Sequence, residues 1–199
     1  EQAGDASKLP PAVIFDVDET VLDNQEFEAR LVAADGTFTP AAFADWCREE
    51  KAGAVPGAVE FCRYAASKGV MLVFLTNRDA AVEDATRSNL EKLGFPADPA
   101  RALVIGKSGE SDKGPRRATI CEKYRVVLLV GDQLQDFASV PKGASNEIRR
   151  RLSQDYLARW GTLWVALPNP TYGDWERALV DPKGTDEENL KRKYEALRR

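Results

Sequence analysis

Five short apolar segments alternate with helical patterns along this chain, and this alternation constrains the fold more than any other feature. The apolar segments are rich in Val, Leu and Ile and are bounded by polar or turn residues, which is typical of buried parallel strands. They cover residues 12–15, 70–75, 102–105, 126–130 and 163–167. Helical patterns lie at residues 57–68, 80–93 and 114–123. We therefore predict an α/β fold with a doubly wound, mainly parallel sheet.

A long stretch after the first apolar segment breaks this alternation. It contains no strand-like run, and Thr39 followed by Pro40 is a good helix start, with Phe43 and Trp46 then falling on one face. We predict that residues 24–56 form a small helical cap inserted beside the functional site. The 199 residues suffice for one domain with a full core, so we expect a single domain over 1–199 that includes this cap. The charged segment 181–199 is predicted to be a surface helix.

Composition excludes several kinds of function. The chain has 28 Lys and Arg against 32 Asp and Glu, a net charge of -4, which argues against a nucleic-acid-binding surface as the main function. It has no histidine, which excludes a histidine nucleophile, a histidine general base and a histidine-rich zinc site. Cys47, Cys62 and Cys121 show no CxxC spacing, so we expect buried free thiols and not a zinc site or a disulfide framework.

The sequence contains no apolar run long enough to span a membrane. Residues 1–11 also lack the apolar core of a signal sequence. We therefore expect either a cytoplasmic chain or a mature or truncated form of an exported protein, and the sequence alone does not separate these.

Polar side chains follow three of the predicted strands. Asp16 and Asp18 follow the first strand, Thr76 and Asn77 follow the second, and a Gly-Asp segment follows the fourth. Ligands of open α/β sheets bind at the carboxyl ends of strands, so these groups are expected to meet at one edge. Taken alone, the Asp16-x-Asp18 pair could equally cap a turn. Several carboxylates at one buried edge favour a bound cation, and an all-oxygen site suits Mg²⁺.

Four segments together resemble the four motifs of the haloacid dehalogenase superfamily. These segments are FDVDETVLDN, LTNR, SDKGPRR and GDQLQD, in the family's order and with fitting separations. More specifically, the chain resembles the class C bacterial acid phosphatases, the lipoprotein acid phosphatase and 5'-nucleotidase group. That likeness extends to VPGAVEF, NLEKLGF and LPNPTYGDWE and covers nearly all of residues 13–176. One departure from the family pattern is visible. The fourth motif usually reads GDNLDDF, whereas this chain reads GDQLQDF. This difference puts in doubt the groups that surround the metal, but not the metal itself.

The resemblance implies a role for each motif residue. Asp16 would attack phosphorus and become an aspartyl-phosphate, while Asp18 would protonate the leaving oxygen and then deprotonate the hydrolytic water. Thr76, Asn77 and Lys113 would bind the phosphate, although by bare sequence Lys113 is a solvated lysine. Mg²⁺ would be bound by the Asp16 carboxylate, the Asp18 main-chain carbonyl and Asp132, with Asp136 either as a further ligand or as support for the ligands. An acidic optimum follows if Asp18 must begin the cycle protonated.

Two aromatic residues match family positions whose rings sandwich a nucleoside base or an aryl group. These are Trp46 in the cap and Tyr172 in the LPNPTYGDWE segment. Without the resemblance, Trp46 is a core residue beside Phe43 and Tyr172 packs a loop. With it, we expect both to bind substrate by stacking, which tolerates any base and suits a broad nucleotidase.

The sequence therefore predicts a Mg²⁺-dependent acid phosphatase that hydrolyses phosphomonoesters, including nucleoside 5'-monophosphates and aryl phosphates. A sugar-phosphate phosphatase is the alternative if Trp46 is buried away from the site. A non-enzymatic binding or storage protein on the same scaffold is another. The resemblance also implies export to the periplasm or outer membrane of a bacterium, with a lipid anchor in the full-length form. No anchor cysteine lies near Glu1. Homodimers are common in the family, yet nothing in the sequence shows an interface.

Overall fold

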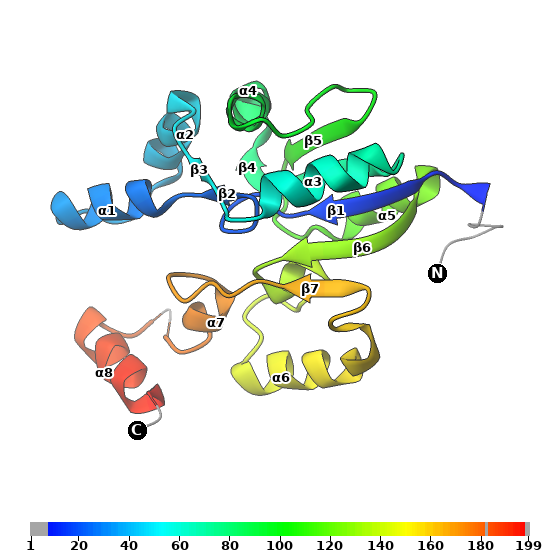
Figure 1. The fold of residues 1–199 in the computed structure, drawn as a ribbon. Coiled ribbons are helices and arrows are strands. Elements are labelled where there is room, and N and C mark those ends of the chain that lie inside the picture. Colours follow the sequence, from blue (N-terminus) through cyan, green and yellow to red (C-terminus); the bar gives the residue numbers. More distant parts are fainter. Residues whose placement is uncertain (1–7, 182, 198–199) are drawn as a thin grey trace.

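A computed structural model describes residues 8–181 and 183–197, with a parallel five-stranded sheet at its centre (Figure 1). The order is β5-β4-β1-β6-β7, with parallel pairing throughout. The strands are β1 Pro11–Phe15, β4 Met71–Asp79, β5 Ala102–Lys107, β6 Arg125–Gly131 and β7 Trp164–Ala166. All five predicted strands are confirmed. The expectation for the N-terminal segment falls largely on residues 1–7, which lie outside the described residues.

Helices cover both faces of this sheet. The α-helices are α1 Gln25–Ala33, α2 Pro40–Glu49, α3 Ala58–Ser67, α4 Glu83–Leu93, α5 Gly114–Lys123, α6 Asn146–Asp155, α7 Asp174–Arg177 and α8 Asp186–Ala196. Successive β1 side chains point to opposite faces, so Phe15 packs with Cys62 of α3 and Leu90 of α4, whereas Ile14 packs with Ile120 of α5. The doubly wound prediction is confirmed.

The segment between β1 and α3 lies beyond the carboxyl end of β1 (Figure 1). Helix α2 begins as predicted, because the Thr39 hydroxyl accepts a hydrogen bond from the Ala42 N–H at 3.1 Å and Pro40 occupies the first turn. The expectation that this segment contains no strand is wrong. Two-residue strands, β2 Leu22–Asp23 and β3 Gly53–Ala54, pair antiparallel at its base. Such short pairs leave no apolar run in the sequence.

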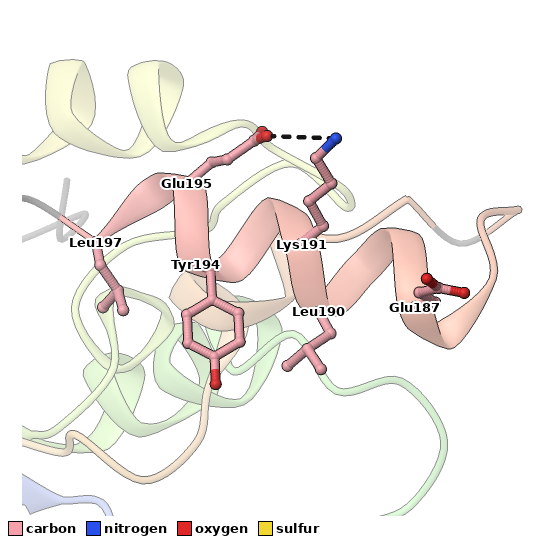
Figure 2. A pocket seen from close by; sticks show the side chains of 6 residues that line it. All are labelled: Glu187, Leu190, Lys191, Tyr194, Glu195 and Leu197. Atoms are coloured by element: carbon pink, nitrogen blue, oxygen red, sulfur yellow. Dashed lines mark ion pairs between the residues drawn. The ribbon is translucent and has the colours of Figure 1, made fainter.

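The C-terminal helix α8 is exposed along one side, as the charged sequence predicts. Its start is fixed by a capping box between Thr185 and Glu188. A hollow lies beside this helix. Figure 2 shows two of its lining residues, Leu190 and Tyr194, pointing the same way, and a dashed line marks the ion pair between Lys191 and Glu195, whose atoms lie 4.0 Å apart. The residues lining the hollow come from α8 and its C-terminal end, and none is a polar group from a strand end. The hollow is therefore separate from the site described next.

Two of the three cysteines are buried free thiols as expected, namely Cys47 and Cys62, whereas Cys121 is only half-buried. Across residues 8–181 and 183–197, no helix has the length and apolar character needed to cross a membrane.

Candidate active site

Three carboxylates meet at the carboxyl edge of the sheet. Asp16 directly follows β1 and Asp132 directly follows β6, which pairs with β1 in parallel. Asp136 ends the short 3-10 helix Leu134–Asp136 that comes after. One oxygen from each of the three residues lies within 4.8 Å of the others. Parallel pairing thus brings together the acidic groups that sequence analysis assigned to a metal site.

Lys113 lies inside this cluster. Its ammonium group donates hydrogen bonds to Asp16 Oδ1 and, at 2.7 Å, to Asp136 Oδ1, and the residue is only 3% exposed. Burial disfavours its charge, but the two carboxylates outweigh that cost and raise the pKa of Lys113 above its ordinary value. The structure therefore places Lys113 as a fixed cation between the carboxylates and not as a solvated lysine.

Backbone groups hold Asp136 in place. Its Oδ2 accepts hydrogen bonds from the N–H groups of Gln133 at 2.8 Å and Asp132 at 3.2 Å. Gly131 permits this return of the chain, because a Cβ there would lie 2.4 Å from the Cβ of Asp136. The end of β6 thus needs glycine for a steric reason, and Asp136 is directed back over it.

Two amides that sequence analysis did not identify orient Asp132. Its Oδ2 accepts hydrogen bonds from Asn169 Nδ2 at 2.7 Å and from Gln133 Nε2 at 3.0 Å. Gln133 Nε2 also donates to the Tyr172 carbonyl at 3.2 Å. Gln133, one of the two residues at which the fourth motif departs from the usual family pattern, therefore links Asp132 to the loop that carries Tyr172. A glutamine at that position was the signal that could have indicated this role.

The carboxylate cluster has the chemistry of a divalent-cation site. Burial raises the pKa of Asp16, the neighbouring carboxylates raise it further, and Lys113 opposes them. Burial likewise raises the pKa of Asp132, with Asp136 adding to the effect. Carboxylate oxygens held this close repel one another, and the single positive charge of Lys113 does not balance three carboxylates. Hard divalent ions such as Mg²⁺ prefer oxygen ligands, so Asp16, Asp132 and Asp136 fit such an ion.

Thr76 and Asn77 lie at the end of β4, beside the carboxylates. Thr76 Oγ1 accepts from the Arg78 N–H at 3.0 Å and donates to Asp18 Oδ2 at 3.3 Å. Asn77 is exposed, and its Oδ1 accepts from Arg116 Nη2 at 2.6 Å. Arg116 thus occupies the amide oxygen and sets the orientation of the Asn77 side chain. Arg116, from the third motif, was not identified by sequence analysis.

Trp46 has a different position from the one expected. It is 2% exposed, its ring lies 6.2 Å from that of Phe27, and the Arg30 guanidinium lies 4.9 Å from its centre. The expected stacking on substrate does not agree with this burial, because no ring face is open. Its indole N–H instead donates to Asn24 Oδ1 at 2.8 Å. Phe27 and Arg30 of α1 cover the ring, and the apolar face of α2 cannot reveal these neighbours.

Glu19 is expected to make the stability of the protein depend on pH. Burial, and then the charge of Asp18, raises the pKa of Glu19 to about 8 against hydrogen bonds from Asn24. In metal-free protein, the unfolded chain releases this proton above its ordinary pKa near 4.5 while the folded chain keeps it up to about pH 8. The free energy of unfolding should therefore fall as pH rises through that window. Urea unfolding at pH 5, 6 and 7 should show Glu19→Gln gaining stability relative to wild type as pH rises. A pH-independent difference would contradict this account.

The fold and site together define a class of protein. A doubly wound sheet with a buried aspartate following its central strand, two further carboxylates and a lysine is the arrangement of the haloacid dehalogenase superfamily. The sequence matches the family described as HAD superfamily, subfamily IIIB (acid phosphatase), over residues 1–175. This chain therefore belongs to that family, whose members are phosphomonoester hydrolases.

Solved structures agree with this membership. The class C acid phosphatase from Bacillus anthracis has a TM-score of 0.85 and 35% identity, over 96% of this chain and 81% of that chain. Its structure with tungstate bound has a TM-score of 0.84 at the same identity and coverage. The stem 31 kDa glycoprotein of Glycine max is 26% identical over 164 residues, which are 80% of this chain and 58% of that protein. The chain thus spans less than two thirds of that relative.

Proposed function

We propose that this chain is a Mg²⁺-dependent acid phosphatase that hydrolyses phosphomonoesters through an aspartyl-phosphate on Asp16. The observation that carries the proposal is the cluster in which the buried Asp16 lies beside Lys113, Asp136 and the half-buried Asp132, while Asp18 is hydrogen-bonded to other partners. One carboxylate is thereby available as a nucleophile and the other as an acid. A relative that binds tungstate, a tetrahedral oxyanion like phosphate, also supports an oxyanion site here.

The first half-reaction needs a nucleophile, an acid and charge neutralisation. An Asp16 carboxylate oxygen forms a bond to phosphorus as the ester P–O bond breaks and its electron pair moves to the leaving oxygen. Asp18 gives that oxygen a proton. Lys113, Thr76 and the Asn77 amide would donate hydrogen bonds to the phosphoryl oxygens. Asp16, Asp132, Asp136 and the Asp18 carbonyl would hold Mg²⁺, which would supply positive charge that offsets the anionic phosphate.

The second half-reaction regenerates the enzyme. Asp18, now deprotonated, accepts a proton from a water molecule. The oxygen of that water then attacks the phosphorus of the aspartyl-phosphate. The bond between phosphorus and Asp16 breaks, its electron pair returns to the carboxylate, and inorganic phosphate leaves. The same carboxyl group acts as acid and then as base, so the cycle needs no histidine.

Substrate choice depends on which rings reach the leaving group. Tyr172 is half-buried in the loop tied to Gln133, and Phe43 is half-buried with its ring centre 5.6 Å from the Arg78 guanidinium that binds Asp18. We assign aromatic contact with nucleoside 5'-monophosphates and aryl phosphates to these two rings. Trp46 contacts Phe27, whose ring in turn contacts that of Phe43. The burial of Trp46 keeps the sugar-phosphate alternative open, since it removes one expected stacking surface.

The organisation of the chain around this site forms part of the proposal. Residues 24–56 would act as a cap within a single phosphatase domain spanning 1–199. As in the sequence analysis, export to the periplasm or outer membrane and homodimer formation are proposals drawn from the family resemblance.

A single assay tests this function. Phosphate release should be measured from AMP, phenyl phosphate and a hexose phosphate at pH 5 to 6, with Mg²⁺ or with a chelator. We expect Mg²⁺-dependent turnover of AMP and phenyl phosphate, and little turnover in chelator. Preference for the hexose phosphate would favour the sugar-phosphate reading. No turnover of any of the three by folded, Mg²⁺-loaded protein would favour a binding or storage role.

A further inference from the structure

The two oxygens of the Asp18 carboxylate have unequal surroundings. Oδ1 accepts three N–H donors, namely Arg78 Nε at 2.9 Å, Arg78 Nη2 at 2.8 Å and Asn24 Nδ2 at 2.9 Å. Oδ2 contacts the Thr76 hydroxyl at 3.3 Å. A carboxylate oxygen has two lone-pair sites, so three donors saturate Oδ1. Oδ2 is thus the oxygen left for exchanging a proton.

Arg78 is itself held rigidly. It is 2% exposed, its Nη1 donates to Thr86 Oγ1 of α4 at 3.3 Å, and its Nη2 donates to Asn24 Oδ1 at 3.2 Å. The ring of Phe43 lies against the guanidinium, with 5.6 Å between their centres. A planar guanidinium with fixed neighbours presents its donors in a fixed direction. Asp18 therefore cannot rotate about its side-chain bonds without breaking several hydrogen bonds at once.

Asn24 links this arrangement to the cap. Its Oδ1 accepts from both Trp46 Nε1 at 2.8 Å and Arg78, which sets the direction of the amide. The Asn24 NH₂ group is consequently turned toward Asp18 Oδ1 and Glu19 Oε1. Trp46 belongs to α2, so a single amide joins the cap helix to the carboxyl group expected to move protons.

We propose that Trp46, Asn24 and Arg78 are positioning residues that reserve Asp18 Oδ2 for the leaving group. The inference rests on the proposed function and assigns an atom to its proton-transfer step. As Asp16 bonds to phosphorus and the ester P–O bond breaks, the leaving oxygen takes the proton from Asp18 Oδ2. Throughout that step Oδ1 remains the acceptor of Arg78 and Asn24.

This assignment has a kinetic consequence. If the Asp18 carboxyl group is wrongly oriented, hydrolysis slows most for substrates whose leaving oxygen is strongly basic, because that oxygen must be protonated to leave. 4-Nitrophenolate leaves readily without full protonation, whereas phenolate depends more on the acid. Both substrates carry the same phosphate on a benzene ring, and the effect of the nitro group on binding cancels when the ratio of a variant is compared with that of wild type. A general acid contributes roughly 10²–10⁴-fold to rate, and this sets the scale of the effect.

The test compares kcat/KM for 4-nitrophenyl and phenyl phosphate at one pH with saturating Mg²⁺. Arg78→Met should raise the ratio of kcat/KM for 4-nitrophenyl phosphate to kcat/KM for phenyl phosphate at least about tenfold over wild type. Trp46→Phe keeps a buried aromatic ring but removes the N–H, and it should raise the ratio in the same direction by a smaller factor. Arg87→Met is the control, because Arg87 lies on α4 and donates to the Ala97 carbonyl, away from Asp18. Its ratio should equal that of wild type.

Equal losses on both substrates in Arg78→Met and Trp46→Phe, with an active wild type, would overturn the positioning role alone. An inactive wild type would overturn the proposed function and this inference with it. If Arg78→Met does not fold, Trp46→Phe and Asn24→Ala decide the matter by the same ratio.

Discussion

Asp16→Asn is expected to lower kcat/KM for every phosphomonoester by at least about 10³-fold while the protein remains folded. The amide is nearly isosteric with the carboxylate but cannot form the bond to phosphorus. Asp16 is buried at the end of β1 beside Lys113, so no other carboxylate can take its place along the same line of attack. Steady-state phosphate release measures the loss, and acid quenching with radiolabelled substrate should trap protein-bound phosphate in wild type and none in the variant.

Asp23→Asn is a matched control for this prediction. It makes the same chemical change in the same segment, where Asp23 Oδ1 accepts a hydrogen bond from the Gln25 N–H at 2.8 Å and takes no part in the carboxylate cluster. Its activity should stay close to that of wild type. Retention of more than about a tenth of wild-type activity by Asp16→Asn would rule out this residue as the nucleophile.

Lys113→Met is expected to cost roughly 3–5 kcal/mol of stability in chelator at neutral pH, because breaking a buried ion pair leaves charge uncompensated. The variant removes the ammonium between Asp16 and Asp136 and leaves three carboxylates close together. Saturating Mg²⁺ should recover part of the loss, since an ion binding only the folded protein stabilises it. Denaturant unfolding with Mg²⁺ and with chelator measures both effects.

Lys107→Met provides the comparison. Lys107 ends β5 and contributes nothing to the carboxylate cluster, so its replacement should change stability by no more than about 0.5 kcal/mol in either condition. A loss in Lys113→Met that Mg²⁺ does not reduce would contradict the view that the lysine and the metal neutralise the same carboxylates.

The sheet was predictable from sequence because its strands are short apolar runs, of which β1 and most of β4 are buried on both faces. Each strand is then a continuous apolar run, and its end is marked by the first polar group, as at Asp16 and Asp132. Parallel strands end at the same edge, so the meeting of these groups followed without coordinates. The motif resemblance was needed for Lys113, whose type and spacing do not distinguish it from a surface lysine.

The surroundings of the catalytic groups were not predictable in the same way. Arg78 lies 60 positions from Asp18, and Trp46 lies 22 positions from Asn24, yet both pairs share short hydrogen bonds. Sequence periodicity reports which face of one helix is apolar and not what covers it. Trp46 was therefore expected at the substrate, whereas Phe27 and Arg30 of α1 cover its ring.

The sequence by itself determined the class of fold, the order of the motifs and the identity of the acidic groups at the sheet edge. These depend on local apolar runs and on residue types, which are written directly along the chain. Only the tertiary structure decided which Asp18 oxygen is saturated, that Gln133 and Asn169 orient Asp132, and that Trp46 is buried. Those features depend on the distance and direction between distant segments, which arise only when the sheet, helices and cap pack together.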